Sequence, residues 1–272
     1  MSELIAISSI ASPCEEQDWN RQQLSSDVTA PRMRFWTYES PGVVLGCSQR
    51  GLVSAIDAAQ RAGVPIAGRQ AGGGAVLTGP WMLSVSVVLP VTHPLALGGA
   101  LVGYRRIGEG FAKVLRGIGI DAHALTSGEA RVAQQESEGA DLQWACYGGL
   151  SPWEVVVGRR KIVGLAQVRR RTGVLVAAGL LYGRPDWAML CKAVGKPIGD
   201  AAGLAQRTSS CEEELGWTPP LADIAIALRR QLQEALYASP PADGRAFVSS
   251  RDYASSGKWD ELLARGADLA VR

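Results

Sequence analysis

Residues 68–90 read GRQAGGGAVLTGPWMLSVSVVLP. The three consecutive glycines, Gly72, Gly73 and Gly74, leave a short piece of backbone without side chains, so a ligand can approach the main chain and its N–H groups can face it. Residues 83–89 then alternate large apolar side chains with two serines, which is the period-two pattern of a strand with a buried face. The stretch therefore predicts a ligand-contacting loop attached to a sheet. Taken alone, the triplet also fits a tight turn or bulge.

The glycine loop does not match two common phosphate-binding patterns. Its glycines are not spaced G-x-G-x-x-G, and no strand-to-helix transition follows them, as a dinucleotide-binding fold requires. No Gly-Lys-Ser/Thr closes the loop, as a P-loop requires. These two classes of nucleotide site are therefore not indicated by this stretch.

A second informative stretch covers residues 158–183 and reads GRRKIVGLAQVRRRTGVLVAAGLLYG. Its lysine, Lys161, is followed by small and apolar residues at 162–166. A lysine that points into such surroundings is a compact positive charge suited to a carboxylate, a phosphate or a developing oxyanion. A surface lysine in a hairpin turn is the alternative, because Gly158 and two arginines precede it.

Length and composition predict one large domain, or a domain with a small appendage. The chain has 272 residues, 47% of them apolar, which is enough for a substantial core. Lys and Arg number 28 against 26 Asp and Glu, so the balance does not indicate general nucleic-acid binding. Pro240 and Pro241 separate a short tail. We therefore expect residues 1–238 to form the main domain and residues 239–272 to pack against it.

The cysteines and the N-terminus favour a cytoplasmic protein without a structural metal. The chain has two histidines and five widely spaced cysteines, namely Cys14, Cys47, Cys146, Cys191 and Cys211. No C-x-x-C pair is present, so a zinc site is not expected, and free thiols fit a reducing compartment. The N-terminus has no basic region of the signal-peptide type, and no apolar run reaches 18 residues, so we expect no membrane association.

Periodicity predicts alternating strands and helices along the chain. Strands are expected over residues 4–10, 32–38, 43–47, 83–89, 153–157, 161–168 and 174–181, the last three as successive antiparallel strands. Helices are expected over residues 15–28, 53–62, 99–115, 187–194, 209–215 and 221–237. A polar loop is expected over residues 126–141.

Four ordered blocks carry a resemblance to a known family. They are R-x-x-GGGAV at 69–76, K-I-V-G-x-A-Q-x-R at 161–169 with GLL closing the next strand, RFWTYESPGVVLGCSQR at 34–50, and RDYASSGKW at 251–259. Together they resemble the lipoate-protein ligase and octanoyltransferase family, which shares its catalytic domain with biotin-protein ligases. The resemblance covers nearly the whole chain.

The resemblance implies an α/β (α+β) domain with a mixed, mainly antiparallel sheet flanked by helices. It also implies a tunnel for an eight-carbon acyl chain that ends near the glycine loop and Lys161. The implied reaction attaches an octanoyl or lipoyl group to a lysine of a lipoyl carrier domain, of the glycine cleavage H protein or 2-oxoacid dehydrogenase E2 type. An acyl carrier protein is a candidate donor, and the enzyme is expected to act as a monomer. Lys161 and N–H groups of the loop would stabilise charge on the carbonyl oxygen.

The block CYGGLSPWE at 146–154 resembles the C-F-x-x-P-S-W-Y-E block of cysteine-type octanoyltransferases. Cys146 is therefore the candidate nucleophile, and a nearby Lys161 would favour its thiolate. A small buried hydrophobe is the alternative role of Cys146. The resemblance assigns acyl or nucleotide binding to further positions, namely Arg69, Gly72, Gly73, Gly74, Ala75, Val76, Gly164, Ala166, Gln167 and Gly179.

Three activities remain open at this stage. The first is a cysteine-dependent transferase with no obligatory cofactor, the second an ATP- and Mg²⁺-dependent lipoate ligase, and the third a non-catalytic binder of lipoylated or biotinylated carriers. The chain departs from the family pattern at Gly68, where an arginine is usual, and at Thr78 and Ala177-Ala178, where histidines are usual. These departures indicate a divergent member.

Basic residues are expected to cluster around the Lys161 hairpin, at Arg159, Arg160 and residues 169–171. Such a cluster is either a solvated edge or a docking patch for acidic carrier domains.

Overall fold

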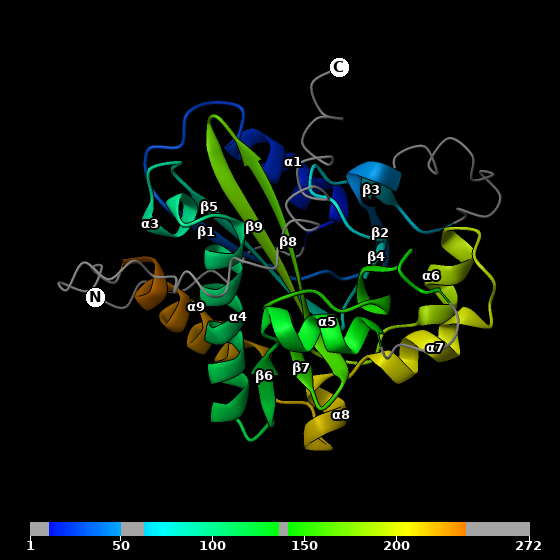
Figure 1. Ribbon diagram of the computed structural model, residues 1–272. Helices are drawn as coiled ribbons and strands as arrows, with labels where there is room; N and C mark the ends of the chain where they lie inside the picture. Colours follow the sequence, from blue (N-terminus) through cyan, green and yellow to red (C-terminus); the bar gives the residue numbers. More distant parts are fainter. Residues whose placement is uncertain (1–10, 50–62, 136–140, 238–272) are drawn as a thin grey trace.

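A six-stranded sheet forms the centre of the computed structural model, which describes residues 11–49, 63–135 and 141–237 (Figure 1). The strand order is β1-β5-β9-β8-β7-β6, and every neighbouring pair is antiparallel. The strands are β1 (Arg32–Trp36), β5 (Met82–Leu89), β6 (Ala122–Ala124), β7 (Val155–Val157), β8 (Arg160–Arg170) and β9 (Gly173–Leu181). The three antiparallel strands predicted between residues 153 and 181 are confirmed as β7, β8 and β9.

A smaller sheet carries the glycine loop. Its order is β3-β2-β4, with β2 (Gly42–Leu45) parallel to β3 (Ile66–Gly68) and antiparallel to β4 (Val76–Thr78). The glycine triplet lies between β3 and β4, so both ends of the loop are held by strands. Because one pair of strands is parallel and the others are antiparallel, the predicted α/β class with a mixed, mainly antiparallel sheet is confirmed.

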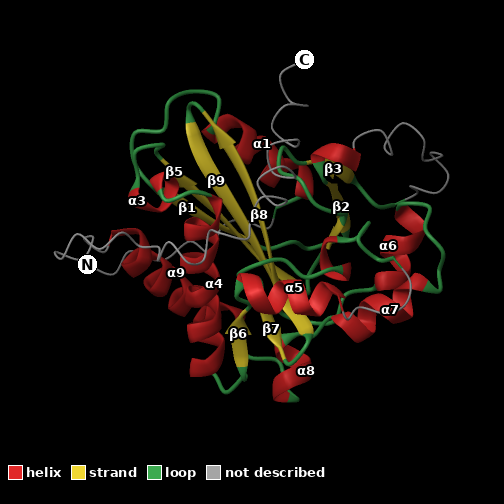
Figure 2. Cartoon of the chain, viewed as in Figure 1, coloured by secondary structure: helices red, strands yellow, loops and turns green. Residues whose placement is uncertain are grey.

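One face of the large sheet is covered by α4 (Ala100–Gly117) and α9 (Leu221–Tyr237), which pack against each other (Figure 2). The apolar side chains of α4 are buried against the sheet, with Ile107, Phe111 and Leu115 each at most 2% exposed. The apolar residues of β5 that alternate with its serines join the same core. This face is therefore closed.

The other face of the large sheet packs against the small sheet, α1 (Pro13–Gln23), α6 (Trp187–Ala193) and α7 (Asp200–Arg207), around a second core. Here the register places Gly164 opposite Gly179 and Ala166 opposite Ala177. A strip of sheet without large side chains leaves space above it. The same alternation that closes one face therefore makes room for a ligand on the other.

The structure corrects the prediction of a loop over residues 126–141. Residues Ser127–Gln135 form helix α5. Its start has a reciprocal capping box, because Glu129 N donates to Thr126 Oγ1 at 3.3 Å while Thr126 N donates to Glu129 Oε2 at 2.7 Å. The capping signature was present in the sequence, but its polar composition suggested a loop.

The remaining described helices are α3 (Pro94–Leu97) and α8 (Cys211–Leu215), with short 3₁₀ turns η1 (Cys47–Gln49) and η2 (Cys146–Gly148). No helix within the described ranges is long and apolar enough to cross a membrane. The strand predicted at 4–10, the helix at 53–62, the block at 251–259 and the tail at 239–272 lie outside the described residues, so these remain predictions, as does the domain boundary at residue 238.

The basic residues around Lys161 do not form one cluster. Arg160 begins β8 and Arg169 lies nine positions further along the strand, which corresponds to about 30 Å. Arg160 pairs with Glu213 and Glu214, and Arg169 donates to Ala96 O at 2.8 Å. The expectation of a single basic patch was wrong because a long strand separates its two halves.

Candidate active site

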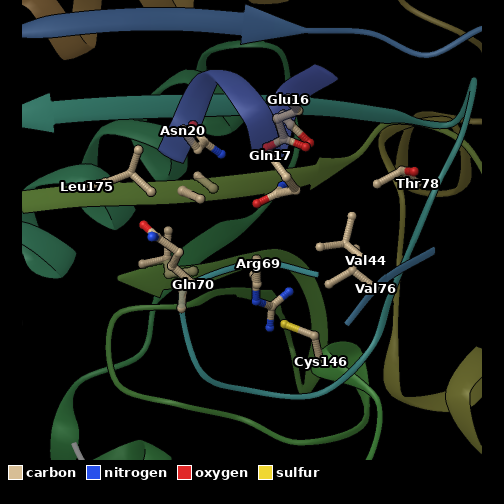
Figure 3. A pocket seen from close by; sticks show the side chains of 18 of the residues that line it. Glu16, Gln17, Asn20, Val44, Arg69, Gln70, Val76, Thr78, Cys146 and Leu175 are labelled. Atoms are coloured by element: carbon tan, nitrogen blue, oxygen red, sulfur yellow. The ribbon is translucent and has the colours of Figure 1, made fainter. Parts of the chain in front are cut away.

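A pocket of about 680 Å³, its open mouth included, lies over the strip of small residues (Figure 3). The floor is formed by Gly164, Ala166 and Gly179 of the large sheet, and Val44 and Val76 of the small sheet form an apolar side wall. The pocket therefore has an apolar surface suited to an alkyl chain.

The glycine loop holds the segment that carries Cys146. Ala75 and Ala145 form a parallel bridge, in which Ala75 N donates to Trp144 O at 2.8 Å and Cys146 N donates to Ala75 O at 2.9 Å. A Cβ on Gly74 would lie 2.5 Å from the carbonyl carbon of Ala145, so the two backbones can meet only at a glycine. The N–H of Ala75 thus holds the segment that carries Cys146.

Arg69 fixes the shape of the loop. Its side chain is buried and donates to Gly72 O at 2.8 and 3.1 Å and to Gly74 O at 2.9 Å. Gly73, between them, has φ of +94°, a conformation that other residues rarely adopt. The predicted arginine and glycines therefore act together, with the cation holding two carbonyl groups of the same turn.

Cys146 is half-buried at the start of η2 and lines the pocket, with its sulfur directed to the same region as Arg69 (Figure 3). A Cβ built on Gly164 would lie 3.6 Å from the Cys146 sulfur, which is ordinary contact. A longer side chain at this position would occupy the space beside the sulfur. Glycine at position 164 therefore keeps the thiol accessible from the pocket.

Lys161 is 1% exposed and lies directly behind Cys146. Its Nζ donates to Cys146 O at 2.6 Å and pairs with Glu154 Oε2 at 2.7 Å. The two stretches identified in the sequence therefore converge, since Cys146 is bonded to the glycine loop on one side and to Lys161 on the other. The alternative of a solvent-exposed hairpin lysine is wrong.

Glu154 is the partner whose role sequence reasoning missed, although it ends the block that identified Cys146. Its carboxylate also accepts from Ser151 N at 2.7 Å and Leu165 N at 3.3 Å. Burial raises the pKa of the Glu154 carboxyl, and the Lys161 ammonium opposes that shift. The preceding residue, Trp153, has φ of +68°, a strained conformation for a bulky side chain. This strained turn presents Glu154 to the lysine.

A β-bulge decides the direction of Lys161. Val155 pairs with Val163 but Val156 pairs with Lys161, so Ile162 is an extra residue in β8. Ile162 and Val163 both belong to the core under α4 and α9. The strict alternation of a strand would place Lys161 on that same core face. The bulge reverses the phase, so the lysine reaches the pocket side.

The structure brings together some of the predicted binding residues and not others. Those that line the pocket are Arg69, Val76, Gly164, Ala166 and Gly179. Gly72, Gly73, Gly74 and Ala75 belong to the loop described above and are not part of the pocket lining. Gln167 lies on the opposite face, where a Cβ on Gly103 of α4 would be 3.9 Å from its Oε1.

The unusual residues also lie at the pocket. Thr78, Ala177 and Ala178 line it, and the Thr78 hydroxyl donates to Gly42 O at 3.1 Å. Sequence reasoning missed a group of polar residues that also line the pocket, namely Glu16, Gln17 and Asn20 of α1. Polar side chains on a predicted helix gave no sign that they would be buried.

Comparison with known sequences agrees with this geometry. Residues 10–233 match the family described as the lipoyl protein ligase A/B catalytic domain. Octanoyltransferase LipM of Carboxydothermus hydrogenoformans is 32% identical over 150 residues, covering 55% of this chain and 52% of that protein. Octanoyltransferase LipM of Kyrpidia tusciae is 34% identical over 153 residues, with 55% and 53% covered. The chain thus spans about half the length of these relatives.

Solved structures show the same fold at low identity. A bipartite lipoate protein ligase from Thermoplasma acidophilum, studied with its E2 lipoyl domain, aligns with a TM-score of 0.56 and 17% identity over 93% of this chain and 88% of that one. A lipoate-protein ligase A bound with ATP aligns with a TM-score of 0.54 and 20% identity over 92% and 85%. The match across residues 10–233, together with this fold, shows that the chain belongs to the lipoyl protein ligase A/B catalytic domain family.

Proposed function

We propose that the protein is an acyltransferase that moves an octanoyl or lipoyl group onto a lysine of a lipoyl carrier domain through an acyl-Cys146 intermediate. The observation that carries this proposal is the position of Cys146, which lines an apolar pocket while the buried Lys161 ammonium contacts its main-chain carbonyl at 2.6 Å. The LipM octanoyltransferases similar to this chain support the same reaction. The carrier domain follows from the family and from the lipoyl domain studied with the archaeal ligase.

Two transfer steps account for all atoms. In the first, the Cys146 thiol loses its proton and the sulfur attacks the carbonyl carbon of an acyl thioester. A new C–S bond forms, and the carrier thiolate leaves and takes up a proton. In the second, the amine of the acceptor lysine attacks the same carbonyl carbon, an amide forms, and the Cys146 sulfur leaves as thiolate while the amine gives up a proton.

Lys161 has a defined role in both steps. An ammonium has three N–H donors, and the contacts with Cys146 O and Glu154 account for two of them. We assign the third to the acyl oxygen, which gains negative charge in each tetrahedral intermediate. Charge stabilisation of this kind acts strongly in a buried site because little water screens it.

An ATP-dependent route is the second candidate, favoured by the similar ligase structure bound with ATP. The predicted cations of the site do not form a phosphate cradle in the described residues. Arg69 donates to the carbonyls of Gly72 and Gly74, and Lys161 is paired with Glu154. We therefore derive no step through ATP or Mg²⁺ and favour the cysteine route.

Intact-mass analysis after mixing with an octanoyl carrier-protein thioester tests the proposal. An octanoyl adduct is expected on wild type and on Cys47→Ser, and none on Cys146→Ser. Cys47 is a matched control because it is the other half-buried cysteine and lies beside the same loop, with its N–H donated to Ala71 O at 3.0 Å. Transfer to an apo lipoyl domain should follow adduct formation.

An absent adduct, or one that persists in Cys146→Ser, would exclude the cysteine route. Pyrophosphate exchange with ATP that depends on lipoate would establish the ligase route in its place. Failure of both assays with retained binding of a lipoyl domain would support a non-catalytic binder.

A further inference from the structure

The side chains on the pocket floor increase in size along the strip of sheet. The register of β8 and β9 sets three pairs of pocket-lining residues in consecutive rows, namely Gly164 with Gly179, Ala166 with Ala177, and Val168 with Leu175. Each row lies two residues beyond the last, because alternate residues of a strand share a face. We call these the glycine row, the alanine row and the branched row. The strip of small residues therefore ends at two branched side chains.

The proposed nucleophile lies over the glycine row. A Cβ built on Gly164 would be 3.6 Å from the Cys146 sulfur and 3.5 Å from Cζ of Tyr147. The Tyr147 hydroxyl donates to Gly179 O at 2.6 Å, so the tyrosine ring covers the rest of this row. Figure 3 shows Cys146 and Leu175 on different sides of the pocket. An acyl chain that leaves the sulfur is therefore directed along the strip, over the alanine row and toward the branched row.

The branched row forms a supported wall at the end of the strip. Leu175 is 4% exposed and belongs to an apolar cluster with Leu24, Val28 and Val88, and Val168 packs against the same cluster. Leu24 is the C-cap of α1, and Val88 is the neighbour of Leu175 on β5. Because this cluster is close-packed, a longer ligand can pass the wall only if several side chains repack.

The length of the strip matches a chain of eight carbons. The glycine row and the branched row are four residues apart on an antiparallel strand, which corresponds to about 13 Å. Seven C–C bonds of about 1.5 Å in an extended zigzag advance about 9 Å. The terminal methyl group then stops about 4 Å from the wall, which is ordinary van der Waals contact. Two more carbons would need about 2.5 Å that the wall does not leave.

We propose that Val168 and Leu175 set the upper limit of acyl-chain length at eight carbons. This inference rests on the proposed function, because it places the acyl carbonyl at Cys146. A six-carbon chain would leave part of the alanine row uncovered and would lose the burial of two methylene groups. A ten-carbon chain would overpack the branched row.

Competition among hexanoyl, octanoyl and decanoyl thioesters on one carrier protein, followed by intact mass, measures this limit. Wild type should form about tenfold less hexanoyl than octanoyl adduct, because two methylene groups are not buried. It should also form about tenfold less decanoyl adduct, because of the overpacking. Val168→Ala should raise the decanoyl adduct to the level of the octanoyl adduct. Val132→Ala is the matched control, because Val132 is 50% exposed on α5 and should keep the wild-type ratios.

Ala177→Val tests the limit in the opposite direction, because it places a branched side chain in the alanine row. Its preferred adduct should be hexanoyl. Val44→Ala tests a path along the side wall of the pocket, and octanoyl should remain its preferred chain. A gain of decanoyl adduct in Val44→Ala and not in Val168→Ala would overturn the inference, and so would an octanoyl preference that persists in Ala177→Val.

Titration calorimetry with free hexanoic, octanoic and decanoic acids measures the length preference without any transfer step. If no thioester forms an adduct on Cys146, the proposed function fails while the calorimetry still decides this inference. Octanoic acid should bind most tightly to wild type, and Val168→Ala should bind decanoic acid at least as tightly. Equal affinity of wild type for octanoic and decanoic acids, binding of none of the three, or an order unchanged in Val168→Ala would overturn it.

Discussion

Replacing Gly74 by alanine tests whether the glycine loop positions Cys146, the proposed nucleophile. The new Cβ would lie 2.5 Å from Ala145 C and 2.6 Å from Trp144 O. Both are main-chain atoms, so no change of side-chain rotamer relieves the overlap. The closest contact must lengthen from 2.5 Å to about 3.4 Å, where ordinary contact begins, so the Cys146 segment moves by about 0.9 Å.

This displacement has two expected consequences. It breaks the hydrogen bonds from Ala75 N to Trp144 O and from Cys146 N to Ala75 O, each worth about 1 kcal/mol, so the free energy of unfolding should fall by about 2 kcal/mol. A nucleophile displaced by about 1 Å should also react about 10²-fold more slowly.

The matched control is Gly72→Ala, because no atom of the described residues lies within 4 Å of a Cβ built at position 72 and the φ of Gly72 is not positive. Single-turnover acylation of Cys146 by an octanoyl thioester, followed by intact mass, measures the rate, and urea titration measures stability. Gly72→Ala should acylate at the wild-type rate. If Gly74→Ala acylates equally fast, or if Gly72→Ala is slowed as much, the loop does not position Cys146.

Lys161→Met leaves the buried Glu154 carboxylate without its cation, so urea titration should show a loss of about 3–5 kcal/mol. The double variant Lys161→Met/Glu154→Gln should recover most of the lost stability but not the acylation rate. If Lys161→Met alone were as stable as wild type, this reasoning would be refuted. Burial, opposed by the Tyr38 hydrogen bond and the Arg69 charge, raises the pKa of Glu16. The folded protein therefore keeps a proton that the unfolded chain releases, and stability falls as pH rises above 4.5. Glu16→Gln should melt higher than wild type at neutral pH, with the gain fading toward pH 4.5. A gain that is constant with pH would be inconsistent with the raised pKa.

Local patterns in the sequence predicted the elements around the site. The antiparallel strands β8 and β9 follow from period-two alternation, and α9 from the 3.6-residue spacing of its leucines, because each pattern is complete within one element. The helix predicted over residues 221–237 and the observed α9 (Leu221–Tyr237) have the same bounds. The glycine triplet and the block that begins at Cys146 also identified two segments of the site without any tertiary information.

The contacts between those segments depend on tertiary structure. The bridge from Ala75 to Ala145 joins residues 70 positions apart, and no local pattern encodes such a pairing. Periodicity alone would place Lys161 in the closed core, and the bulge at Ile162 turns it toward Cys146. The sequence by itself therefore determined the family, several of the strands and helices around the site, and the chemical groups of the site. The packed sheets decided which way these groups point and which partners they have. The phase of a strand, the pairing of buried charges and the burial of a polar helix face beside a cavity arise only when distant segments of the chain meet.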